Sequence, residues 1–128
     1  MGRWFSAFLP VLLYGALIVF LSAQSELPHA PKIWDKAAHF GEYTILALLV
    51  TRGVRLVSGW SGVKSAATAV FLATAFAVTD EAHQFFVPGR DSDPWDVVAD
   101  FLGSLFGAGT YLAWLQLRAR FRRSAVAG

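Results

Sequence analysis

The chain has 128 residues, of which 55% are hydrophobic and only 16% are charged; its formal net charge is +2 and it has no cysteine. Because a soluble domain carries about 25% charged residues, the composition favours one integral membrane domain, residues 1–128. The missing cysteines exclude disulfides, thiol catalysis and thiolate metal sites. The basic residues cluster near the C-terminus. Such a cluster is typical of a cytoplasmic membrane anchor, and we expect no nucleic-acid partner.

Two helices are predicted in the first half. Residues 4–23 form an apolar run long enough to cross a bilayer and too long for a usual signal-peptide core. Residues 35–52 are predicted to form the second span, although Asp35, Lys36, His39 and Glu42 occupy its first half. Ionisable groups at that depth are costly unless they face a protein interior. The second helix therefore spans only if its neighbours shield its polar half.

Two more helices follow, at residues 64–86 and 94–117. The third ends in a polar group, Asp80, Glu81 and Gln84. Residues 87–90, Val-Pro-Gly-Arg, are typical of a tight turn. Asp93 followed by a proline is a strong signal for a capped helix start. The fold class predicted is all-α: a bundle of four transmembrane helices.

The basic residues predict an orientation. Eight lie before the first span, between the second and third, or after the fourth, and three lie on the other side. The positive-inside rule then places both termini in the cytoplasm and directs the loops 24–34 and 87–93 outward. The polar halves of the second, third and fourth helices would converge beneath the outer surface.

Helical spacing assigns faces. Asp35, His39 and Glu42 share one stripe of the second helix, with Lys36 and Tyr43 beside it; Asp80 and Gln84 share a face of the third. For Asp35 two roles stay open and can coexist: a cap of the second helix and a part of the site. For Asp80 and Glu81 a structural ion pair with Lys36 or Arg90 and a chemical role are equally open. On the fourth helix one stripe holds two acids and two glycines, which indicates a close helix crossing below a polar pocket, within the chain or in a homodimer. Its members are Asp96, Asp100, Gly103 and Gly107.

These segments resemble a known family. Residues 35–43, DKAAHFGEY, resemble the DKxxHFxxY block of VanZ-like membrane proteins, and residues 80–90, DEAHQFFVPGR, resemble their DExxQxFxPGR block. Ser22 and Gln24 are similar to a short serine–glutamine element, and the acid–glycine stripe resembles D-x-x-x-N-x-x-G-x-x-x-G, with Asp100 where the family more often has Asn. The resemblance implies a small multi-pass protein of the bacterial cytoplasmic membrane. In some relatives it is linked to resistance to teicoplanin-type glycopeptides.

Two functions from different classes remain open. The first is a binder of a lipid-linked envelope or cell-wall component, with the head oriented by polar residues and the tail between helices. Its ligand-binding candidates are Asp35, Lys36, Glu42, Tyr43, Gln84, Arg90, Asp96 and Asp100. The second is a membrane-embedded hydrolase or transferase acting on such a lipid, with His39 and Glu81 as acid/base pair and Asp80 as a further candidate. No nucleophile motif supports the second.

His39 has three interpretations: an interior histidine bonded to a carboxylate, an acid/base group, or a metal ligand. The spacing of Asp35 and His39 suits ligation from one helix, but no second histidine motif accompanies it. We therefore expect no metal and no cofactor. The expected partners are membrane lipids.

Overall fold

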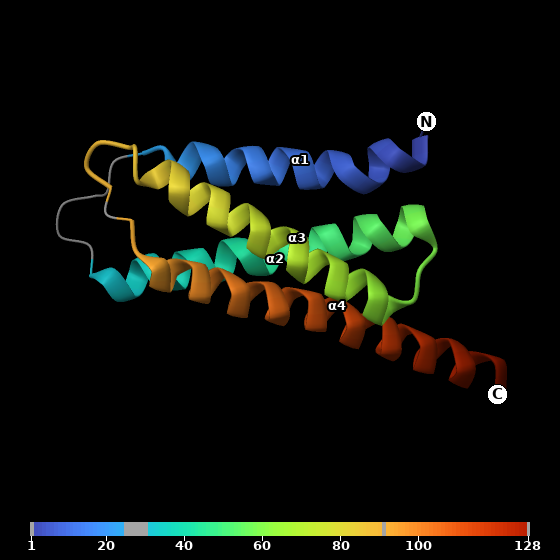
Figure 1. Cartoon of the computed structure of the whole chain (residues 1–128). Coiled ribbons are helices and arrows are strands. Elements are labelled where there is room, and N and C mark those ends of the chain that lie inside the picture. The colour runs from blue at the N-terminus through green and yellow to red at the C-terminus, as the bar shows by residue number, and fades with distance from the viewer. Residues whose placement is uncertain (1, 25–30, 91, 128) are drawn as a thin grey trace.

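The computed structural model describes residues 2–24, 31–90 and 92–127, with side chains placed up to residue 125. They form four helices, α1 (Gly2–Ser22), α2 (Lys32–Ser58), α3 (Gly62–Gln84) and α4 (Pro94–Ala127), and no strand occurs among these residues. The predicted all-α bundle is confirmed. Both chain ends lie at one end of the bundle, and the α1–α2 and α3–α4 connections lie at the other, the loop end (Figure 1). Which side of a membrane each end faces stays a prediction.

Local chemistry explains three of the eight helix ends. Gly59 terminates α2 in the left-handed conformation, with φ 67°, and its N–H donates to the carbonyl of Arg55. The Ser61 hydroxyl accepts a hydrogen bond from the N–H of Lys64 and caps α3. Asp93 caps α4 as predicted: its carboxylate accepts from the N–H of Trp95 at 3.0 Å. These three residues define where α2 ends and where α3 and α4 begin.

Helix α2 is the central helix of the bundle, and it packs against α1, α3 and α4. By length and composition α1, α3 and α4 are each apolar enough to cross a membrane, and α2 is not. The polar first half of α2 is the reason. This arrangement agrees with the expectation that α2 needs shielding by its neighbours.

The core is built from small residues on α3. Ala69, Ala73 and Ala77 repeat every four residues and are fully or almost fully buried. They pack against a cluster on α2 that contains Tyr43 and Leu46. Small side chains allow the helices to approach closely, as in other membrane bundles. The same face of α3 continues into its polar end, so the core leads directly to the polar residues.

Gly103 and Gly107 form the close crossing predicted for the fourth helix, and they do so within the chain. A Cβ on Gly103 would overlap the backbone carbonyl of Phe40, and one on Gly107 would overlap that of Thr44. Both positions therefore require glycine for α4 to rest on α2. A homodimer through these glycines stays a prediction.

Two observed helices are clearly longer than predicted. Helix α2 covers Lys32–Ser58 and not only residues 35–52; because it begins after an extended Pro31, Asp35 lies in its first turn and does not cap it. Helix α4 continues to Ala127 instead of ending at residue 117. Hydrophobic residues determined the predicted span, whereas a helix continues into water as long as its residues favour it.

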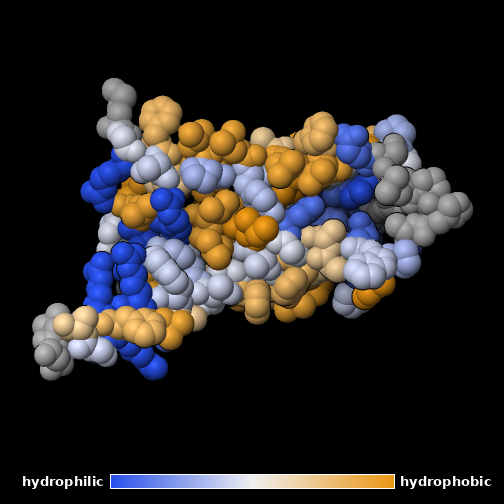
Figure 2. Space-filling view, turned by 180° about the vertical axis from the view of Figure 1, so that it is seen from behind, coloured by the Kyte–Doolittle hydropathy of each residue, from blue (hydrophilic) through white to orange (hydrophobic). Residues whose placement is uncertain are grey.

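The outer surface is apolar over the middle of the bundle. In Figure 2 hydrophobic atoms form a broad band, and hydrophilic atoms gather at both ends and reach inward at the loop end. Large side chains such as Leu12, Phe71 and Phe106 are more than half exposed on this band. A soluble monomer does not expose so much apolar surface. The molecule is therefore a membrane protein.

Candidate functional site

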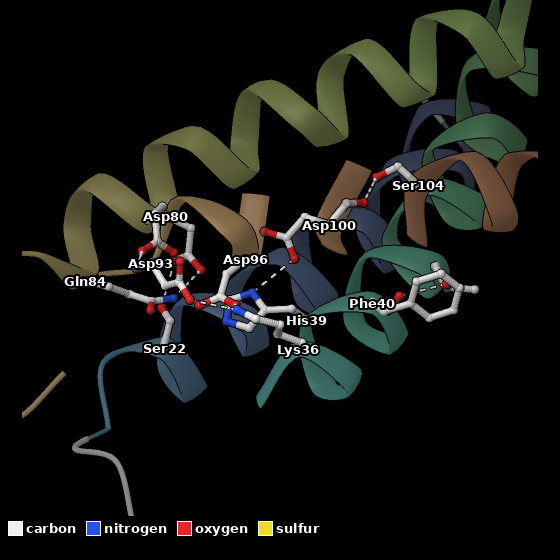
Figure 3. Close-up of polar contacts among 12 residues, drawn as sticks. Ser22, Lys36, His39, Phe40, Asp80, Gln84, Asp93, Asp96, Asp100 and Ser104 are labelled. Carbon is white, nitrogen blue, oxygen red and sulfur yellow. Dashed lines mark hydrogen bonds and ion pairs between the residues drawn. The ribbon is translucent and has the colours of Figure 1, made fainter. Parts of the chain in front are cut away.

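The loop end holds a group of polar side chains from all four helices and the α3–α4 connection, which we call the polar basin (Figure 3). Several of its members are almost fully buried, including His39, Asp80, Glu81, Asp96 and Asp100. The basin consists of Ser22, Asp35, Lys36, His39, Glu42, Asp80, Glu81, Gln84, Arg90, Asp93, Asp96 and Asp100. Two sets of contacts organise it.

The first set joins α1, α3 and the α3–α4 connection. The Ser22 hydroxyl donates to Asp80 Oδ1 at 2.7 Å, and Gln84 Nε2 donates to Asp80 Oδ2 at 3.3 Å. Arg90 Nη2 in turn donates to Gln84 Oε1 at 2.9 Å. The turn that presents Arg90 is closed by its N–H to the carbonyl of Val87, with Gly89 at φ 82°. A continuous chain of hydrogen bonds thus runs from α1 to the α3–α4 connection.

The second set joins α2 to α4. Lys36 Nζ donates to Asp93 Oδ2 at 2.7 Å and to Asp96 Oδ1 at 2.8 Å. His39 Nδ1 lies 3.0 Å from Asp100 Oδ1, where the ring N–H donates to the carboxylate. Both contacts lie between the glycine crossing and the loop end, within about two turns of Gly103 on the same two helices. The close approach of α2 and α4 therefore sets the geometry of both ion pairs.

Asp93 lies where the two sets meet. Its backbone N–H donates to Glu81 Oε1 at 2.6 Å, while its carboxylate accepts from Lys36 and from the N–H of Trp95. The hydrogen bond from the Lys36 ammonium, and after it the one from Trp95, holds the pKa of the Asp93 carboxyl below its ordinary value. Asp93 is thus a charged link between the helix ends, a role beyond the predicted cap.

Some buried polar atoms in or near the basin have no hydrogen-bond partner in the described part of the chain. They include Glu81 Oε2, Arg90 Nε and the hydroxyl of Tyr43, whose side chain is fully buried. Since buried polar groups are nearly always hydrogen-bonded, each of these atoms has unused capacity for a partner. Tyr43 packs against Phe76 in the core, with ring centroids 6.3 Å apart.

The structure corrects the predicted pairings. Among the described residues, neither Asp80 nor Glu81 forms an ion pair with Lys36 or Arg90. Asp80 accepts hydrogen bonds from Ser22 and Gln84, and Glu81 accepts one from the backbone N–H of Asp93. The carboxylate bonded to His39 is that of Asp100 and not that of Glu81. The role of His39 and Glu81 as an acid/base pair stays a prediction. Glu42 and Asp35 are half-buried at the edge of the basin.

Sequence reasoning missed one member of the second set. Ser104 is fully buried, and its hydroxyl donates to the backbone carbonyl of Asp100 at 2.8 Å. The sequence does contain a signal for this residue: a serine one helical turn after Asp100, beside the stripe that carries Gly103 and Gly107. His83, by contrast, is exposed and lies outside the basin.

Two apolar grooves adjoin the basin. One, of about 370 Å³, lies between α1, α2 and α3, and its lining ends at Val19 and Phe76, about one turn before Ser22 and Asp80 on the same helices. The other, of about 360 Å³, lies between the end of α3 and the start of α4. It is lined by Val78, Glu81, Ala82, Phe85, Phe86, Ser92, Pro94 and Val97. Both grooves lead from apolar surface to the polar side chains.

One trio of basin residues has the composition of a metal site. A ligand atom from each of Asp35, His39 and Asp96 lies within 4.8 Å of the other two. The trio combines two residues of α2 with one of α4, so it exists only when these helices are packed together.

Comparison with known proteins gives one result on the family. Searches of the curated proteins and of the solved structures found no match to this chain. The family model described as VanZ/LLP1 matches residues 7–116, which include the polar basin, both glycines of the crossing and parts of all four helices. With this match over most of its length, the chain belongs to the VanZ/LLP1 family of membrane proteins.

Proposed function

We propose that this protein binds a lipid-linked component of the cell envelope at the outer leaflet of the bacterial cytoplasmic membrane. The polar basin would receive the anionic head, and the apolar grooves would receive the hydrocarbon tail. A cell-wall precursor carried on a lipid has this chemistry.

Arg90 carries the proposal. Lys36 is occupied by two carboxylates, but no carboxylate of the described chain pairs with Arg90, which contacts only the neutral Gln84 side chain through its guanidinium. Its Nε–H is buried and lacks a partner. A guanidinium fixed by one hydrogen bond and open at its remaining donors suits a phosphate or carboxylate, which it contacts through two parallel bonds.

The grooves support the same proposal. The groove between α1, α2 and α3 is lined by apolar side chains such as Phe8, Leu12 and Leu72, and it reaches the basin within about one turn. A ligand with a polar head and a long tail would fill both sites at once. A water-soluble ligand would leave the groove unused.

The test is native mass spectrometry of the protein purified in mild detergent from a bacterial membrane. We expect a co-purifying phospho- or carboxylate lipid whose retention falls about tenfold to a hundredfold in Arg90→Ala, the loss for a hydrogen bond to a charged group. Lys32→Ala is the matched control, because Lys32 is an exposed cation at the same end of the bundle. Equal retention in the two variants would refute the proposal.

A membrane-embedded hydrolase or transferase acting on such a lipid is the second candidate. The buried His39–Asp100 pair favours it, because a carboxylate bonded to one ring nitrogen orients a histidine for general-base work at the other. Asp100 thus replaces Glu81 in the predicted acid/base pair. For an enzyme, His39→Ala abolishes turnover of the co-purified lipid while its binding remains. For a binder, no turnover of that lipid is detected in the unaltered protein.

A further inference from the structure

The trio of Asp35, His39 and Asp96 has the ligand types and spacing of a metal site. One imidazole nitrogen and two carboxylate oxygens lie within 4.8 Å of one another. Ligands of one tetrahedral zinc ion, each about 2.0–2.2 Å from the metal, are about 3.3–3.6 Å apart. The three side chains would therefore have to move together by up to about an ångström to bind one ion.

The ring of His39 supplies the second observation. The side chain is 95% buried, since only 5% of it is exposed. Its Nδ1 lies 3.0 Å from Asp100 Oδ1, so the ring is held by a carboxylate through one nitrogen and Nε2 is the nitrogen left for a metal. Metal-binding histidines characteristically bond a carboxylate through one nitrogen, which leaves the other to bind the metal.

The charges around the trio point to a cation. Asp96 is 1% exposed, and Lys36 contacts its Oδ1. Asp35 has no hydrogen bond or ion pair with the described residues. Across the basin the carboxylates outnumber the lysine and arginine side chains. Buried carboxylates in excess of cations are unfavourable unless they are protonated or bind a cation.

We propose that Asp35, His39 and Asp96 bind one divalent first-row transition-metal ion, with Asp100 as the residue that positions the His39 ring. Imidazole with carboxylate oxygens suits Zn²⁺ and Mn²⁺ better than Ca²⁺ or Mg²⁺, which prefer oxygen alone. Three protein ligands leave one position open on a tetrahedral ion. The proposal holds whether or not the basin binds a lipid, and it excludes His39 as a general base, because both roles use Nε2.

The experiment measures metal binding directly. The full chain, purified in detergent and treated with a chelator, is dialysed against Zn²⁺ and then against Mg²⁺, and bound metal is determined by mass spectrometry. We expect one Zn²⁺ per chain, and no Mg²⁺ at the same free concentration. Co²⁺ in place of Zn²⁺ should give visible absorption bands that report nitrogen and oxygen ligands.

Substitutions identify the ligands. His39→Gln and Asp96→Asn should each weaken Zn²⁺ binding at least a hundredfold, and Asp100→Asn about tenfold to a hundredfold, as for other residues that orient a ligand. Asp93→Asn is the matched control, because Asp93 shares Lys36 with Asp96 but is outside the trio. It should keep the ion.

Two results would overturn the proposal: no Zn²⁺ bound to the folded chain, or binding that is unchanged in His39→Gln and Asp96→Asn. If those variants fail to fold, Asp35→Asn decides. Asp35 is half-buried and has no partner to lose, so the variant should fold, and its Zn²⁺ affinity should fall about tenfold. Unchanged affinity in Asp35→Asn would refute the trio as the site.

Discussion

Replacing Gly107 by alanine tests whether the close crossing of α2 and α4 holds the bundle together. The added Cβ would overlap the carbonyl oxygen of Thr44 and lie 2.8 Å from its carbonyl carbon and 3.0 Å from its Cα. These are backbone atoms, which cannot rotate away. Helix α4 must therefore retreat from α2 by more than half an ångström, the difference between 2.8 Å and the 3.4 Å at which ordinary contacts begin.

The magnitude follows from two opposing effects. Overpacking a well-filled interior costs about 1–3 kcal/mol, and the rigid backbone places this site at the upper end. Alanine in place of glycine favours the helix by about 1 kcal/mol. Gly107→Ala should thus lower the free energy of unfolding by about 2 kcal/mol. A retreat of α4 would also separate Lys36 from Asp96 and His39 from Asp100.

Gly109 provides the control, because nothing lies within 4 Å of a Cβ placed there. Gly109→Ala keeps the gain in helix propensity and lacks the overlap, so it should be as stable as the unaltered protein or more so. The assay is unfolding in mixed micelles with rising dodecyl sulfate, followed by circular dichroism. Equal stability of the two variants would show that the α2–α4 contact does not depend on glycine.

Three further predictions concern the loop end. Ser22→Ala should lower the free energy of unfolding by about 1–3 kcal/mol, because it leaves the buried Asp80 carboxylate without one of its donors; unchanged unfolding would contradict this. The pKa of Asp93 is lowered in the folded protein, so its ionised carboxylate stabilises the fold. This contribution should be complete above the unfolded-state pKa of about 4 and should disappear as the pH falls through the lower folded value. In acid titrations of unfolding, Asp93→Asn should remove this pH dependence. In intact cells, a cysteine at Ser92 should react with an impermeant maleimide and one at Ser61 should not; the reverse would invert the predicted orientation.

The sequence predicted which residues share a helix face. Asp80 and Gln84 are four apart, and their side chains are hydrogen-bonded; Gly103 and Gly107 are four apart, and both contact α2. The cap at Asp93 was predicted too, since capping depends on a few neighbouring residues. Local chemistry and helical periodicity are sufficient for such features.

The partners across helices could not be predicted. Which carboxylate meets His39 depends on how far α4 is displaced along α2, and periodicity within one helix carries no information about that displacement. The glycine crossing fixes it: Gly103 lies against Phe40, and Asp100, one turn outward, then meets His39. Charge complementarity alone allowed Lys36 to pair with Asp80 or Glu81 as readily as with Asp93.

The central position of α2 has a consequence for biogenesis. A helix whose first half carries Asp35, Lys36, His39 and Glu42 cannot partition from the translocon into lipid alone, because each such charge adds about 2.5–3.5 kcal/mol near the middle of a bilayer. It must wait at the translocon until α3 and α4 emerge. Integration of this chain is therefore a concerted event that requires its C-terminal half. In a ribosome-stalled fragment ending before α3, α1 should be inserted while the second segment stays accessible to a water-soluble maleimide.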